Sequence, residues 1–79
     1  MKLKVQYFAL LREQAGRANE EVQSNAANPS GLLQELRHRH PFTLTEKQLK
    51  VAVNGEFASW DQALADGDSV VFIPPVAGG

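Results

Sequence analysis

The sequence predicts an α+β fold in which a mixed β-sheet packs on one main helix. The chain has 79 residues, enough for one domain with a modest core, since a chain of this length buries only about 60–65% of its unfolded surface. Strand-like segments lie in both halves of the sequence, and one substantial helical segment separates them. The last strand segment, residues 69–73, is the most apolar, which is typical of a central strand covered on both faces.

The first part of the chain predicts two strands and a short helix. Residues 3–7 alternate apolar and polar side chains, the pattern of a strand with one buried face. Residues 9–15 suit a short helix, which Gly16 can end in the left-handed conformation. Residues 19–24 form a weaker second strand, in which Val22 is the one strong apolar residue.

The main helix is expected to begin after Asn28. Asn28 suits the N-cap and Pro29 the first helical position. Three leucines within residues 32–36 lie on one helical face. Residues 37–40 are basic or histidine, which complements the C-terminal end of the helix dipole, and Pro41 is expected to end the helix.

The second half predicts three strands and two turns. Residues 49–53 form a third strand, and the Asn-Gly pair at residues 54–55 is a strong hairpin signal. Residues 56–58 can pair back onto that strand. The Asp-Gly-Asp sequence at residues 66–68 indicates a turn before the last strand, residues 69–73.

The order of these elements is that of the β-grasp, or ubiquitin-like, fold. We expect residues 1–79 to form a single domain with an extended C-terminal tail over residues 74–79. Pro74 and Pro75 cannot donate hydrogen bonds to a strand ladder and favour polyproline geometry, so the chain must leave the sheet stiffly there. From Pro75 to Gly79 the chain could reach about 16–18 Å fully extended.

The end of the tail has features suited to threading into another protein. Val76, Ala77, Gly78 and Gly79 have small or medium side chains without charge, and glycine lets the walls of a tunnel approach the backbone. The functional group that such a tail delivers is the α-carboxylate of Gly79. Adenylation would activate this carboxylate, and a sulfur nucleophile could then displace AMP and leave a thiocarboxylate. The alternative is an ordinary frayed terminus.

Composition excludes several function classes. The chain has no cysteine, so it offers no thiolate nucleophile or thiolate metal ligand, and any sulfur that it handles must be bound elsewhere. The net charge of −1 argues against nucleic-acid binding, and no run approaches the roughly 18 apolar residues of a membrane span. The N-terminal segment lacks the apolar core of a signal peptide, so we expect a cytoplasmic protein.

Charge is distributed unevenly along the chain. All eight lysines and arginines lie in residues 1–53, whereas residues 54–79 contain four acidic side chains and no basic one. This acidic final third is either a solvated edge or a means of steering the chain toward a basic partner.

A partner surface is expected on the sheet face opposite the main helix. Phe8 follows the alternation of the polar residues of the first strand, and Ile73 lies opposite Phe72 on the last strand. Because one helix covers only one sheet face, we expect Phe8, Ile73 and nearby Phe57 to form an exposed patch that docks partners. The alternative is that the helix at residues 9–15, or a loop, covers them.

Other candidate residues are interpreted as structural. His38 and His40 are two positions apart, so they point to different helix faces and make a poor metal pair; we expect helix-end cations and no metal site. Trp60 is expected to pack at the edge of the core. Asp66 and Asp68 flank a glycine and are expected to shape its turn.

Three segments resemble the family of molybdopterin synthase small subunits, the MoaD-type, ThiS-related, ubiquitin-like sulfur carriers. The first is Tyr-Phe-Ala-Leu-Leu-Arg-Glu followed by Gly16, and the second is Val-Ala-Val-Asn at residues 51–54. The third, residues 64–79, combines the Asp-Gly-Asp turn with Pro-Pro and Gly-Gly. The match spans nearly the whole chain, although Ala77 stands where many relatives carry Ser or Thr.

The resemblance implies a reaction cycle at Gly79. An adenylating enzyme related to ubiquitin activators would use ATP to make the acyl-adenylate, and a cysteine desulfurase or rhodanese system would supply sulfur for the thiocarboxylate. The tail from Pro75 through Val76, Ala77 and Gly78 would enter the large synthase subunit and give sulfur to cyclic pyranopterin monophosphate, forming the molybdopterin dithiolene of the molybdenum cofactor. The implied synthase is a heterotetramer whose catalytic pocket lies on the large subunit, and the small subunit binds no cofactor tightly.

Three alternatives stay open. A thiamine-pathway sulfur carrier would share the Gly-Gly end, although the Phe8-Ala9 opening and Pro74-Pro75 look like the molybdopterin branch. A ubiquitin-type protein modifier would be joined through Gly79 to target lysines. A β-grasp interaction module would have an idle tail.

Overall fold

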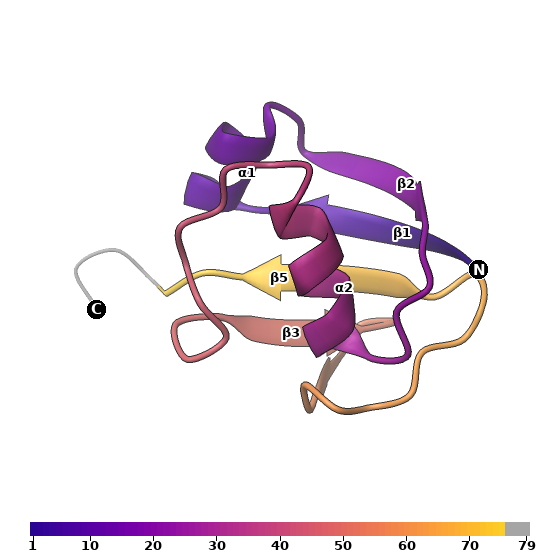
Figure 1. Ribbon diagram of the computed structural model, residues 1–79. Helices are drawn as coiled ribbons and strands as arrows, with labels where there is room; N and C mark the ends of the chain where they lie inside the picture. The colour runs from indigo at the N-terminus through magenta and orange to yellow at the C-terminus, as the bar shows by residue number, and fades with distance from the viewer. Residues whose placement is uncertain (76–79) are drawn as a thin grey trace.

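The computed structural model describes residues 1–75 and confirms the α+β class, with five strands in one sheet (Figure 1). The elements, in chain order, are β1 (Lys2–Tyr7), α1 (Ala9–Ala15), β2 (Asn19–Gln23), α2 (Pro29–Arg37), β3 (Lys50–Val53), β4 (Glu56–Ala58) and β5 (Ser69–Ile73). Each occupies nearly the same residues as the segment that the sequence predicts. The tail residues 76–79 lie outside the described part of the chain.

The sheet is mixed and has β5 at its centre. The strand order is β2-β1-β5-β3-β4; β1 and β5 run parallel, and the other neighbouring pairs are antiparallel. Helix α2 lies across one face of this sheet (Figure 1). The arrangement is the predicted β-grasp, in which two hairpins and a crossing helix bring the first and last strands side by side.

The core lies between α2 and the sheet. The apolar face of α2 contributes Leu32, Leu33 and Leu36, all fully buried. Alternate residues of the strands meet them from the sheet, and their side chains are Leu3, Val5, Tyr7, Val22, Val51, Val53, Val70 and Phe72. Trp60 stacks on Phe72 with ring centroids 5.9 Å apart and an interplanar angle of 12°, so it packs at the edge of the core as predicted.

The expectation that β5 is covered on both faces is wrong. Val70 and Phe72 are fully buried toward α2, whereas Val71 and Ile73 on the opposite face are only half-buried. The central position of β5 satisfies its backbone hydrogen bonds on both edges, but the described chain has only one helix long enough to cover a sheet face. β5 therefore has more apolar side-chain surface than the described part of the chain buries.

Local signals set the ends of α2, with one difference from the sequence prediction. The Asn28 side chain accepts a hydrogen bond from the Gly31 amide at 2.9 Å, and Pro29 occupies the first helical position, as predicted. The helix ends at Arg37, well before Pro41, which was expected to end it. Backbone amides of residues 38–40 bond to carbonyls three or four positions back, which tightens the last turn before the proline is reached.

Replacing Phe72 and Phe57 by alanine tests the difference between the two sheet faces. Phe72→Ala should lower the free energy of unfolding by about 3–5 kcal/mol, because its ring is fully buried. Phe57→Ala should change it by less than about 0.5 kcal/mol, because its ring is 74% exposed. Urea denaturation followed by circular dichroism measures both values. Similar losses for the two variants would contradict this assignment of faces.

Candidate functional site

The chain leaves the sheet at one end of its central strand. β5 pairs with β3 as far as Ile73 opposite Lys50, and Pro74 then follows. Pro74 is half-buried against the sheet, and Pro75 is exposed. Since neither proline has a backbone N–H, the ladder cannot continue past Ile73. The predicted tail thus departs from the middle of the sheet.

Of the tail residues predicted to enter a partner protein, only Pro75 is described by the structure. Val76, Ala77, Gly78 and Gly79 lie outside the described residues. Their predicted roles stay predictions. The structure describes the base of the tail, where the chain leaves β5 through Pro74 and Pro75.

An apolar surface lies beside the base of the tail, on the sheet face that α2 does not cover. Strand register places Ile73 beside Lys50, Val71 beside Ala52, and Ala52 beside Phe57. Phe57 is 74% exposed and Phe8 is 44% exposed. We call this surface the sheet-face patch; it consists of Phe8, Ala52, Phe57, Val71 and Ile73.

The exposure of Phe8 follows from a sharp change of direction after β1. Phe8 keeps the extended backbone of the strand, with φ −128° and ψ 155°, so its side chain points away from the core residue Tyr7. Ala9 then takes a left-handed φ of 49°, and α1 begins. α1 buries Leu11 in the core and leaves Phe8 exposed. Helix α1 therefore does not cover Phe8, contrary to the alternative considered from the sequence.

A shallow groove runs between β4 and the base of the tail. Its lining includes Phe57, Ile73 and both prolines, together with Gln48 and Lys50. The Lys50 ammonium nitrogen lies 5.8 Å from the centroid of the Phe57 ring, within the range of a cation–π contact. The groove offers apolar surface and one positive charge, which suits the binding of another protein at the point where the tail departs.

Two of the four acidic residues of the last third, Asp66 and Asp68, lie away from this groove. Asp66 and Asp68 precede β5, at the end of the sheet opposite the tail (Figure 1). Asp66 accepts a hydrogen bond from the Lys2 amide at 2.6 Å. Asp68 accepts bonds from the Ala65 amide at 2.8 Å and from the Asn54 side chain at 2.9 Å, and these bonds hold its pKa below the ordinary value. These carboxylates shape the turn, as predicted.

The sequence interpretation missed a polar cluster on the helix side of the sheet. Tyr7 donates from its hydroxyl to Glu20 at 2.5 Å, and the His40 ring nitrogen lies 2.7 Å from the same carboxylate oxygen. The interpretation of His40 as a helix-end cation is wrong, because α2 ends three residues earlier and the chain then folds back toward β2. The cluster joins β1, β2 and the segment after α2.

Burial and hydrogen bonding act in opposite directions on Glu20. Burial alone would raise the pKa of this carboxyl, but the hydrogen bonds from Tyr7 and His40, with the nearby charge of Arg17 at 3.6 Å, hold it below the ordinary value. Burial, together with the bond to Glu20, raises the pKa of Tyr7, so its hydroxyl stays protonated and donates. The cluster is therefore a satisfied structural network with no group poised for acid–base chemistry.

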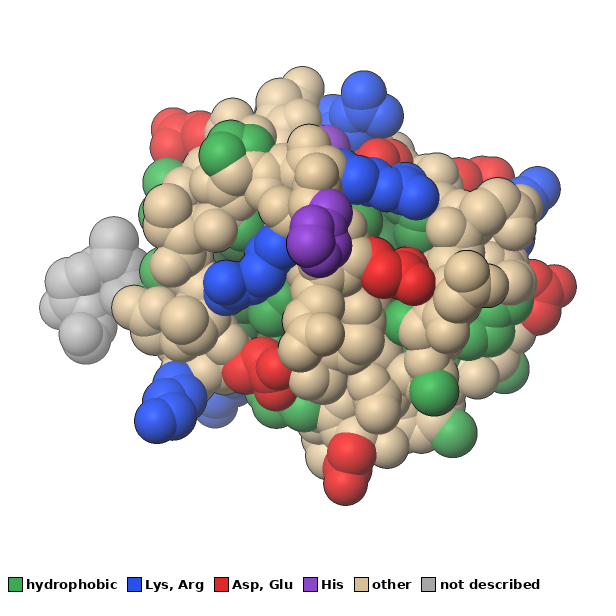
Figure 2. Space-filling view, in the orientation of Figure 1, with side chains coloured by type: hydrophobic (Ala, Val, Ile, Leu, Met, Phe, Trp, Pro, Cys, Tyr) green, Lys and Arg blue, Asp and Glu red, His purple; other side chains and the backbone are tan. Residues whose placement is uncertain are grey.

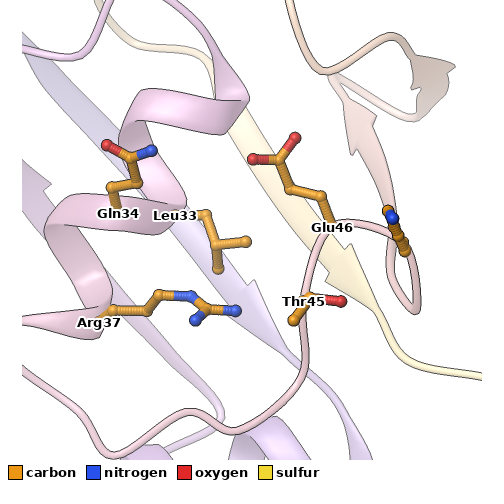
Figure 3. Close-up of a pocket in the computed structure, with 6 residues that line it drawn as sticks. Leu33, Gln34, Arg37, Thr45 and Glu46 are labelled. Carbon is orange, nitrogen blue, oxygen red and sulfur yellow. The ribbon is translucent and has the colours of Figure 1, made fainter.

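A second hollow lies between α2 and the loop that precedes β3. Leu33, Gln34 and Arg37 face it from the helix, and Thr45 and Glu46 face it from the loop (Figure 3). Two of its charged side chains, Arg37 and Glu46, are already engaged within the chain. Arg37 donates to the Leu44 carbonyl, and Glu46 accepts from the Ser30 hydroxyl at 2.6 Å. This hollow is part of the contact between the helix and the loop.

The described residues offer neither a metal cluster nor a membrane-spanning helix. Within residues 1–75, no group of three or more His, Asp or Glu side chains is placed to hold a metal ion. No helix in this same range has the length and apolar character required to cross a bilayer.

Comparisons with known proteins match the whole chain. A model of the ThiS family matches residues 5–79. The molybdopterin synthase sulfur carrier subunit of Escherichia coli (strain K12) is 38% identical over 80 residues, which cover 98% of this chain and 99% of that protein.

Solved structures agree with this fold. The crystal structure of SAMP1 from Haloferax volcanii has a TM-score of 0.84 and 30% identity, with all of both chains covered. The putative molybdopterin converting factor, subunit 1, from Pyrococcus furiosus has a TM-score of 0.79 and 37% identity, with 96% of this chain and 99% of that chain covered. These likenesses confirm the predicted β-grasp.

Glu20→Gln tests the polar cluster. The substitution should lower the free energy of unfolding at pH 7 by about 1–2 kcal/mol, because a buried charged acceptor is lost. The pKa of Glu20 is below 4.5 in the folded chain, so its contribution is present above about pH 4.5 and is lost as pH falls through the folded pKa. The difference between parent and variant, measured by urea denaturation, should therefore shrink at acidic pH.

The neighbouring Glu21→Gln is the matched control. Glu21 is exposed and pairs with Lys2 at 3.9 Å, so its loss should change the free energy of unfolding by less than about 0.5 kcal/mol. A difference for Glu20→Gln that grew toward low pH would contradict the stated direction of the pKa shift.

Proposed function

The chain belongs to the ThiS family, and from that premise we propose that it is the sulfur carrier subunit of a molybdopterin synthase. The observation that supports this most directly is the full-length match to the E. coli subunit of that name, combined with a central strand that ends in Pro74-Pro75 beside an exposed apolar face. A carrier needs a compact body that its partners recognise and a thin extension that they can enclose. Those two parts meet at Ile73.

In this proposal the reactive group is the α-carboxylate of Gly79. A carboxylate oxygen attacks the α-phosphorus of ATP, pyrophosphate leaves, and the acyl-adenylate forms on a partner adenylating enzyme. A hydrosulfide or a persulfide supplied by a cysteine desulfurase or rhodanese system then attacks the acyl carbon, and AMP leaves. Hydrosulfide gives the thiocarboxylate directly, whereas a persulfide gives an acyl disulfide, which a thiol cleaves to the thiocarboxylate as that thiol is oxidised to a disulfide. The absence of cysteine from the chain agrees with this chemistry, because the sulfur is bound to the main chain.

The sulfur transfer itself takes place on the large subunit. Pro75 directs the tail away from the body, and Val76, Ala77 and Gly78 thread the active site of that subunit. The thiocarboxylate sulfur of Gly79 bonds to cyclic pyranopterin monophosphate, water then cleaves the acyl C–S bond, and the sulfur stays on the pterin while Gly79 returns to the carboxylate for another cycle. The chain is thus one subunit of a sulfurtransferase whose substrate pocket belongs to its partner.

The alternatives differ in partner or product. A thiamine-pathway carrier would share the chemistry at Gly79, but the E. coli relative is named for molybdopterin synthase, which supports that branch. A protein modifier would transfer the activated Gly79 to lysine amines and accumulate as isopeptide-linked conjugates. An interaction module with an idle tail would keep its function when the tail is shortened.

Deleting Gly78 and Gly79 tests the reactive end. After incubation with the adenylating enzyme, ATP and the sulfur donor, the parent chain should gain the mass that corresponds to replacing one oxygen by sulfur. The shortened chain should gain none and should support no molybdopterin synthesis. Its thermal unfolding should match that of the parent, because the core is complete without the tail. Normal synthesis with the shortened chain would contradict the proposal.

Phe8→Ala tests the body of the carrier. Phe8 sits at the edge of the sheet-face patch next to the departing tail, so its truncation should weaken binding to the large subunit by about 1–2 kcal/mol or more. Calorimetric titration measures the affinity, and thermal unfolding reports whether the fold is retained. Unchanged affinity in a folded variant would remove Phe8 from the interface.

A further inference from the structure

The sheet face that α2 does not cover carries three lysines, of which only Lys50 lies beside the base of the tail; Lys2 and Lys4 lie toward the opposite end of the sheet. The strand face that α2 does not cover carries Lys2 and Lys4 from β1 and Lys50 from β3. Among the strand residues on this face, Glu21 is the only acidic one, and it pairs with Lys2 at 3.9 Å. The face is therefore apolar at its centre and carries the positive charge of Lys50 at the end from which the tail departs.

The opposite face has a different character. Positive and negative side chains are interspersed over the α2 side of the molecule (Figure 2). The acidic turn at Asp66 and Asp68 lies at the far end of the sheet, and its carboxylates accept hydrogen bonds within the chain. The described surface beside the tail thus carries the positive charge of Lys50, even though the chain as a whole has a net charge of −1.

Lys50 has the most specific position of the three lysines. It is exposed, pairs in register with Ile73, and lines the groove from which Pro74 and Pro75 depart. Its ammonium lies over the Phe57 ring, and no ion pair within residues 1–75 involves it. A carboxylate from another protein can approach this ammonium while apolar side chains of the same protein cover Phe57 and Ile73.

We propose that the sheet-face patch binds an apolar surface of the synthase large subunit that is bordered by acidic side chains, with Lys50 as a specificity-determining contact. The inference rests on the proposed function and adds the charge of the partner surface. Of the two interpretations of the acidic final third, the proposal favours a solvated edge over steering toward a basic partner, because the charge beside the tail is that of Lys50. Complementary charge suppresses wrong partners and speeds encounter.

Charge reversal at Lys50 tests the proposal. Lys50→Glu should weaken binding of the full chain to the purified large subunit by about tenfold or more at low salt, and Lys50→Met by a smaller factor, because methionine keeps an apolar stem. The difference between parent and Lys50→Glu should shrink as NaCl rises from about 0.05 to 0.5 M, because salt screens charge pairs. Titration calorimetry measures affinity, and thermal unfolding confirms that each variant folds.

Lys47→Glu is the matched control. Lys47 is also exposed and lies three positions earlier, but it lines the hollow beside α2. Lys47→Glu changes the net charge of the chain by the same amount as Lys50→Glu. The affinity of this variant for the large subunit should stay within about twofold of that of the parent, since separated exposed charges are largely screened.

Several outcomes would overturn the inference. Equal losses for Lys47→Glu and Lys50→Glu would reduce the effect to net charge, and tighter binding of Lys50→Glu would mean that the partner surface is basic. A loss of affinity of Lys50→Glu for the adenylating enzyme, with its affinity for the large subunit unchanged, would mean that Lys50 contacts the adenylating enzyme instead. Failure of the parent chain to bind the large subunit would instead contradict the proposed function itself, which separates the two failures.

Discussion

A single helix on a five-stranded sheet is the constraint on which the rest of this structure depends. α2 buries one face, and the small core it closes accounts for nearly all the fully buried side chains. The central strand β5 has apolar residues on both faces, so Val71 and Ile73 project from the face that α2 does not cover, where residues 1–75 leave them half-buried. An apolar surface of this kind marks a site of protein association. One face of the sheet therefore forms the core, and the opposite face is available for contact with another protein.

The same strand joins recognition to chemistry. β5 is held on both edges, by β1 and by β3, so its end is fixed relative to the sheet-face patch. Pro74 and Pro75 convert that fixed end into a stiff departure from the body. A partner that binds the patch consequently receives the start of the tail in a defined place, and part of the entropy cost of ordering the tail is removed before it is enclosed. This placement of the tail requires both the patch, which the partner binds, and the tail that starts beside it.

Much of this could be predicted from the sequence, because its signals are local. Alternation gave β1, the Asn28-Pro29 pair gave the start of α2, and Asn54-Gly55 gave the hairpin, since each depends on neighbouring residues only. The pairing of His40 with Glu20 could not be predicted, because twenty residues separate them and the path of the chain after α2 brings them together. Lys50 was missed for a related reason. Alternation with Val51 and Val53 puts it on the outer face, but its position beside Ile73 requires the order of the strands.

The separation of stability from reactivity has a chemical consequence. An activated acyl group is consumed by any nearby nucleophile, and the described body holds no cysteine and no acid–base group poised near the base of the tail. The side chains at that base are apolar, apart from Gln48 and the Lys50 ammonium, which is drawn toward the Phe57 ring. An ammonium group has no lone pair with which to attack an acyl carbon, and over an aromatic face it can still pair with a carboxylate. Lys50 can thus contribute to recognition at the base of the tail without competing for the acyl group, while the apolar side chains around it offer contact area to the same partner.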